Sequence, residues 1–289
     1  MTAPSPWLEH LTQADWDVLR RAAREAGVHA EDLPHDEAAL AAVLVHPGTF
    51  STICRADDEA WVGASPFLVF AAAVHRGWGD LQGARHVDEW VGARQRLPVL
   101  GVDDLRDFLS SGQRRLFLAS LLASYTRVAS GSTWVQTARG WRRRRFSELD
   151  PVRLASLLEV VSAEERPGVY RRLGDLALFL TGVFPDHTAL AGLGPLAEGR
   201  LLRAGGLGAE VVADDRGPEP IPGPVGLLER LGQRWYHLAC RSAGRPLTGT
   251  MPVVAEVAER FGLARRVLNV VTDRYLFPVR RRWFGEPAA

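Results

Sequence analysis

The sequence lacks lysine altogether and has only two cysteines. All 35 basic residues are therefore arginine. An arginine-only composition is typical of a GC-rich genome, so a given arginine is not by itself a sign that its planar, forked side chain was selected. Cys54 and Cys240 are too few for a disulfide framework, and they favour a pair of reduced thiols in the cytosol.

Long apolar runs and a secretory leader are missing as well. The uncharged stretch at residues 176–185 is too short to cross a membrane, which takes a helix of about 20 apolar residues, and no apolar run in the sequence reaches that length. The N-terminus MTAPSPWLEH has no basic region followed by an apolar one, so no signal peptide is predicted. These features predict a soluble, cytoplasmic protein. Its formal net charge of +1 means that any attraction to an acidic partner must come from a local patch.

Motifs of catalysis and metal binding are absent too. No His-Glu-x-x-His or Glu-x-x-His pair, phosphate-binding loop or Gly-x-Ser-x-Gly elbow is present. His237 and Cys240 lie one helical turn apart, but two ligands do not make a metal site. The Gly-rich stretch that follows Arg203 lacks the lysine of a phosphate loop and is interpreted as a connector. We therefore predict no metal and no cofactor.

The pattern of apolar residues predicts a mainly all-α fold, a multi-helix globular bundle. Its centre is expected at residues 169–187, because residues 176–185 are apolar on every side of a helix. A second core helix is expected over residues 67–74, introduced by a capping hydroxyl at Ser65 and by Pro66. A strand is the alternative for residues 67–74, but the alanines there favour a helix.

Other segments complete the predicted bundle. Helical spacing and capping residues predict further helices at residues 12–27, 36–45, 47–55, 81–94, 103–109, 114–128, 151–161, 225–242 and 252–276. The Gly/Pro-rich segment 191–226 is expected to be a loop, with a helical turn at 201–204. We divide the chain into an N-terminal helical part (1–129), a hairpin (130–148) and a C-terminal helical part (149–289), within one compact unit.

One small β-hairpin is predicted near residues 133–146. The segments TWVQ and WRRRRF flank the turn TARG, in which Gly140 supplies the positive φ of a tight turn. The second strand joins arginines to aromatic rings, and a similar cluster ends the chain. The binding candidates are Trp141, Arg142, Arg143, Arg144, Arg145 and Phe146 in the hairpin, and Arg280, Arg281, Arg282, Trp283 and Phe284 near the C-terminus.

Such clusters suit phosphate contacts combined with base stacking, or contact with an acidic protein surface. Along a strand, Arg142 and Arg144 face one way and Arg143 and Arg145 face the other, so each face offers two arginines at most. The alternative is that these arginines pair with the protein's own Asp and Glu residues. We expect a protein partner or self-association first and nucleic acid second, with no membrane.

Asp175 is the second candidate, because it lies at the edge of the most apolar predicted helix. Arg171 and Arg172 precede it by four and three residues, which is the spacing of an ion pair on one helix face. The favoured interpretation is an internal ion pair that fixes helix packing. The functional alternative is a polar pocket formed with Asp186 and His187. Simple exposure to solvent is the third possibility.

Three segments resemble parts of uncharacterised helical proteins from high-GC Gram-positive bacteria. They are RRFSELDPVRL (144–154), GVYRRLGDLALFLTGVFPDH (168–187) and VLNVVTDRYLFP (267–278). The resemblance implies a bacterial cytosolic setting, and it transfers no activity and no site residue. The sequence thus predicts a non-enzymatic interaction or regulatory protein whose arginine and aromatic residues bind an acidic partner, protein or nucleic acid. The alternative is an enzyme or small-molecule binder with a pocket near Asp175, Asp186 and His187.

Overall fold

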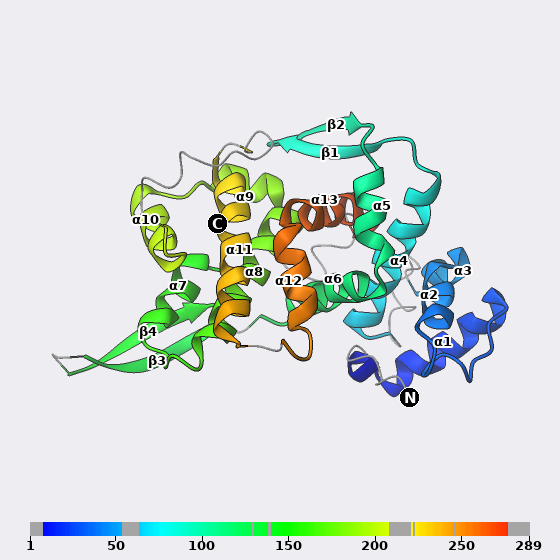
Figure 1. The fold of residues 1–289 in the computed structure, drawn as a ribbon, viewed down its shortest axis with the longest axis horizontal. Helices are drawn as coiled ribbons and strands as arrows, with labels where there is room; N and C mark the ends of the chain where they lie inside the picture. The colour runs from blue at the N-terminus through cyan, green and yellow to red at the C-terminus, as the bar shows by residue number, and fades with distance from the viewer. Residues whose placement is uncertain are drawn as a thin grey trace. The chain divides into compact units, whose positions relative to one another are not determined.

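The computed structural model describes residues 8–53, 64–128, 130–137, 140–207, 221, 223–244 and 247–276, and the side chains of these residues except in 130–137 and 141–146. The chain forms two compact units. Unit 1 comprises Met1–Glu89, Leu97–Thr126 and Val270–Phe284, and unit 2 comprises Trp90–Arg96, Arg127–Asn269 and Gly285–Ala289. The described residues are mostly helical, so the predicted mainly α fold is confirmed (Figure 1).

Unit 1 is built from short helices whose ends follow the capping signals of the sequence. Its elements are the 3-10 turn η1 (Leu8–His10), α1 (Gln13–Ala26), α2 (Glu37–Val45), α3 (Pro47–Ile53), α4 (Pro66–Gly83), α5 (Asp103–Ser110) and α6 (Gly112–Ser124). Thr12 and Asp15 form the expected capping box at the start of α1. Asp15 also accepts a hydrogen bond of 2.6 Å from the backbone N–H of Ser65, the residue that caps α4.

Helix α4 is the core element of unit 1. None of the residues 67–74 is more than 5% exposed, which confirms the predicted core helix and rules out the strand. α4 packs against α2 and α6. The π-helical turn η5 (Thr272–Leu276) returns to it: a side chain at Gly77 would meet Val271 at 3.1 Å, and the Tyr275 hydroxyl donates to Asp80.

Unit 2 begins with a β-hairpin and continues as a helical bundle. Its elements are β3 (Ser130–Thr137), β4 (Gly140–Ser147), α7 (Pro151–Ala155), the 3-10 turn η3 (Ser156–Glu159), α8 (Arg166–Val183), α9 (Pro185–Ala191), α10 (Pro195–Ala204), α11 (Gly223–Ser242), α12 (Met251–Glu259) and α13 (Phe261–Val271) up to Asn269. The central helix is α8, whose residues 173–183 are all buried. Leu176, Phe179, Leu180 and Val183 are buried as predicted.

Glycine lets α8 and α11 approach each other closely. A Cβ atom at Gly174 would come within 2.4 Å of the Tyr236 ring, and one at Gly232 would come within 2.8 Å of the Cβ of Ala177. No side chain therefore fits at either glycine without displacement. The two helices form the most extensive helix pair of the unit, and Figure 1 shows them running side by side.

Several predicted elements differ from the structure. The helix expected over 151–161 is an α-helix only up to Ala155 and continues as the 3-10 turn η3, and the central helix expected at residues 169–187 ends at Val183, before α9. The helix expected over 81–94 is wrong: α4 ends at Gly83, where Arg106 donates to the carbonyls of Leu81 and Ala84, and a second hairpin follows, formed by β1 (Val87–Gly92) and β2 (Gln95–Val99). The single helix expected over 252–276 is broken at Arg260, between α12 and α13. The helical turn expected at 201–204 is the end of the longer helix α10.

The backbone accounts for the second hairpin. Arg94 adopts a φ of 60°, the left-handed conformation that a tight turn requires, and Trp90 and Val87 are only 5% exposed. In the sequence this segment is polar and carries no strand alternation, so it was mistaken for a surface helix. Among the described residues, no helix is both long and apolar enough to cross a membrane.

Candidate binding surface

The predicted Arg/aromatic hairpin exists and is slightly longer than expected. β3 and β4 pair antiparallel from Ser130 opposite Ser147 to Thr137 opposite Gly140. Gly140 has a φ of 105°, as the turn prediction required. β4 contacts α7, and in Figure 1 the two strands extend away from that helix. We call residues 130–147 the ribbon.

The register assigns the ribbon's residues to two faces, because cross-strand partners lie on the same face and neighbours along a strand alternate. One face, which we call the tryptophan face, contains Ser132, Trp134, Gln136, Trp141, Arg143 and Arg145. The other contains Gly131, Thr133, Val135, Arg142, Arg144 and Phe146. The predicted split of the four arginines into two pairs therefore holds.

Trp134 is the candidate that sequence reasoning missed. It is paired with Arg143, in the row next to Gln136 and Trp141, so the tryptophan face holds two tryptophans and two arginines. The signal was present in the sequence, because a two-residue turn between Thr137 and Gly140 determines this register. Counting outward from that turn would have paired Trp134 with Arg143.

The ribbon carries charge of one sign only. Residues 130–147 include Arg139 and Arg142–Arg145, five arginines, and no Asp or Glu, which gives a formal charge of +5 against +1 for the whole chain. The acidic residues that follow are bound to other groups. Glu148 accepts from Arg172 of α8 at 3.2 Å, and Asp150 accepts from the backbone N–H groups of Val152 and Arg153 at the start of α7. These contacts anchor the base of the ribbon.

The second predicted cluster, formed by Arg280, Arg281, Arg282, Trp283 and Phe284, lies outside the described residues.

Asp175 forms the predicted ion pair. Its Oδ1 accepts from Nε of Arg171 at 2.8 Å and from the hydroxyl of Tyr236 at 2.7 Å, and Asp175 as a whole is 8% exposed. Burial alone would lower the pKa of the Arg171 guanidinium, but Asp175, Tyr236 and Cys240 together outweigh burial and raise that pKa. Arg172 pairs with Glu148 instead. The prediction of an internal ion pair is thus confirmed, with Arg171 as the partner.

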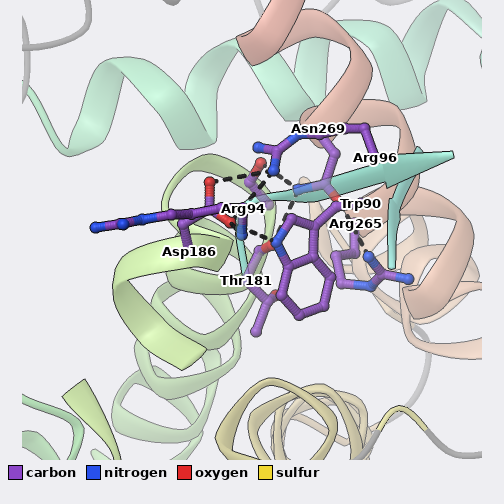
Figure 2. A network of polar contacts seen from close by, with 8 residues as sticks. Trp90, Arg94, Arg96, Thr181, Asp186, Arg265 and Asn269 are labelled. Atoms are coloured by element: carbon purple, nitrogen blue, oxygen red, sulfur yellow. Dashed lines mark hydrogen bonds and ion pairs between the residues drawn. The ribbon is translucent and has the colours of Figure 1, made fainter. Parts of the chain in front are cut away.

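Asp186 belongs to a different network, shown in Figure 2. Its carboxylate accepts from the indole N–H of Trp90 at 2.8 Å, from the backbone N–H of Arg94 at 2.6 Å and from the guanidinium of Arg96. Burial alone would raise the pKa of the Asp186 carboxyl, but these three donors outweigh it and hold that pKa below its usual value. The network fastens residues 90–96 to the first turn of α9.

Asp175 and Asp186, the two carboxylates of the alternative pocket, therefore belong to separate hydrogen-bond networks. Asp175 lies eight residues before the end of α8, so about 12 Å of helix separates it from the residues that precede Asp186. His187 is half-buried. Each carboxylate has its own set of donors, and each set has a packing role.

A third polar network, which the sequence did not suggest, closes the C-terminal end of α8. The side-chain amide of Asn269 donates to the carbonyls of Thr181 and Gly182 at 3.0 and 2.7 Å. Its carbonyl accepts from Arg265, which also pairs with Glu229 at 2.6 Å (Figure 2). Asn269 and Arg265 are 3% and 5% exposed, so this network satisfies buried helix-end carbonyls rather than facing a ligand.

The structure contains a small apolar cavity in unit 1. A cavity between η1, α1, α2, α4 and α6 is lined by apolar side chains and has room for one water at most, about 10 Å³. Within the part of the chain that the structure describes, no three His, Cys, Asp or Glu side chains are grouped as metal ligands would be.

Comparison of the chain with models of known protein families, with curated proteins and with solved structures found no match.

Proposed function

We propose that this protein is a non-enzymatic interaction or regulatory protein that binds an acidic partner through the ribbon. The observation that carries the proposal is a two-stranded hairpin with five arginines and no acidic residue, anchored to helices at one end. A guanidinium makes two parallel hydrogen bonds to a carboxylate or a phosphate, so closely spaced arginines suit an acidic surface.

The anchoring of the ribbon supports this role. A hairpin of two strands is at best marginally stable on its own, because it has no hydrophobic layer to bury. Here the base is held by α7 and by the pair of Glu148 with Arg172. The strands also keep unpaired edges, where charged residues discourage pairing with other sheets. Edge protection alone would explain some of the arginines, and the experiment below separates it from binding.

The proposed setting is the bacterial cytoplasm. Its support is the resemblance of three segments to helical proteins of high-GC Gram-positive bacteria, together with the arginine-only composition and the two cysteines.

A heparin column, as a generic polyanion, tests the proposal. The variant Arg143→Gln/Arg145→Gln removes two charges from the ribbon. The control Arg200→Gln/Arg241→Gln removes two charges from exposed positions on α10 and α11. We expect the ribbon variant to elute at clearly lower salt than the wild type and the control to elute close to it, with all three melting at similar temperatures. Equal elution of the ribbon variant and the control would mean that the ribbon is not the contact surface.

A further inference from the structure

We infer that the tryptophan face of the ribbon binds single-stranded nucleic acid, with the arginines on phosphates and the tryptophans stacked on bases. This inference rests on the proposed function and names the partner's chemistry. It starts from the register, which collects Trp134, Trp141, Arg143 and Arg145 on one face.

The arrangement of residues along the ribbon suits both the phosphates and the bases of a single strand. Trp141, Arg143 and Arg145 follow one another at every second position of β4, at intervals of about 7 Å. Trp134 occupies the adjacent row, diagonally across from Trp141. Tryptophans thus occupy the first two of three rows counted from the turn, and arginines occupy the second and third. A strand lying along the ribbon would therefore meet both kinds of side chain within neighbouring nucleotides.

Single strands fit this face better than a duplex or an acidic protein. In a duplex the base faces are stacked on one another, so two tryptophans have no ring to meet, whereas an unpaired base offers its flat face. An acidic protein surface would use Arg143 and Arg145 but gains nothing specific from a pair of tryptophans. Stacking also tolerates any base, so binding should depend little on sequence.

The first test uses fluorescence anisotropy with labelled oligothymidylate, a labelled DNA duplex and a labelled polyglutamate peptide. We expect oligothymidylate to bind most tightly. Trp141→Ala should weaken its binding by about 5- to 150-fold, the loss of one stacked base, and should leave elution from heparin unchanged. Trp141→Phe keeps an aromatic ring and should restore most of the affinity. A purely structural tryptophan would instead change nucleic-acid and heparin binding together.

The salt dependence gives a second, independent readout. Each phosphate neutralised on a single strand contributes about −0.7 to the slope of log affinity against log salt. Arg143→Gln/Arg145→Gln should therefore flatten the slope by about 1.4. Arg142→Gln/Arg144→Gln removes the same charge from the opposite face, and it should flatten the slope by less. Equal effects from the two faces would contradict a face-specific site.

The outcomes separate this inference from the proposed function. If Arg143→Gln/Arg145→Gln weakens heparin binding but oligothymidylate does not bind at micromolar protein, the nucleic-acid inference is wrong and the proposed function stands. Tighter binding of polyglutamate than of oligothymidylate would assign the face to an acidic protein. If the ribbon variant binds heparin like the wild type, both proposals fail.

Discussion

Replacing Asp175 by asparagine tests how much the ion pair on α8 stabilises unit 2. The substitution keeps the size of the side chain and one carbonyl oxygen, and it removes the negative charge. Arg171 then remains in a largely buried position and loses the Asp175 carboxylate, and the Tyr236 hydroxyl loses a charged acceptor. The Arg171 side chain donates to Thr250 as well, at 3.4 Å, so it is not free to swing into solvent without breaking a second contact.

The expected loss follows from the burial of the pair. Breaking a buried ion pair by removing one partner costs about 3–5 kcal/mol. The side chains of Arg171 and Asp175 are 24% and 11% exposed, so solvent relieves part of the cost and we expect the lower end, about 3 kcal/mol. At about 2–4 °C of melting temperature per kcal/mol for a domain of this size, the shift should be about 6–12 °C downward.

Thermal denaturation followed by circular dichroism measures this shift. Tyr236→Phe, which removes only the hydroxyl, should cost about 1.5 kcal/mol, because one hydrogen bond to a charged group is lost while the ring keeps its packing. Asp17→Asn breaks an exposed pair with Arg20 and is the matched control, with almost no expected change. If Asp175→Asn melts like Asp17→Asn, the ion pair contributes nothing and the argument from burial is wrong.

Two further predictions concern the cores of the two units. Phe179→Ala in α8 should lower the free energy of unfolding by about 3–5 kcal/mol, because its ring is 1% exposed and packs edge-on against Phe184. An unchanged urea midpoint would show that neighbouring side chains fill the space of the ring with no loss of stability. The pKa of His75 in α4 is lowered to about 3, first by burial and second by Arg115. Below pH 6.5 the unfolded chain therefore binds a proton at His75 that the native chain does not bind. Stability should therefore decline as the pH falls from 6.5 toward 3, and His75→Leu should show a smaller drop in melting temperature between pH 7 and pH 4; equal drops would exclude His75 as the cause.

Elements determined by local chemistry could be predicted from the sequence. Ser65 and Pro66 predicted the start of α4, and the uncharged run on α8 predicted the core of unit 2. The pair of Arg171 with Asp175 followed from helical spacing alone. The ribbon followed from its turn glycine. In each case the signal lies within a few residues of the structure that it determines.

Features that depend on distant partners could not be predicted. Trp90 is buried in the second hairpin, where Asp186, 96 residues later in the chain, accepts a hydrogen bond from its indole N–H. No residue near Trp90 in the sequence indicates this partner. Helix α12 ends at Glu259, with Arg260 as its C-cap, although the apolar pattern continues through the break to Phe261, whose ring contacts the distant Tyr236. The arginines of the candidate surface were predicted from their clustering, but Trp134 was missed, although counting outward from the turn pairs it with Arg143.

The packing of residues 270–276 against α4 has a consequence for the nascent chain during synthesis. Val271 and Tyr275 complete the packing around Gly77 and Asp80, yet the segment that carries them begins at Val270. Val270 is synthesised 144 residues after Thr126, where the preceding segment of unit 1 ends. At about 5–20 residues per second, a ribosome needs about 7–29 s to cover that distance. During this interval the part of α4 that residues 270–276 cover stays exposed, although the first helices of unit 1 leave the ribosome earliest. Unit 1 therefore cannot complete its core until nearly the whole chain has been synthesised.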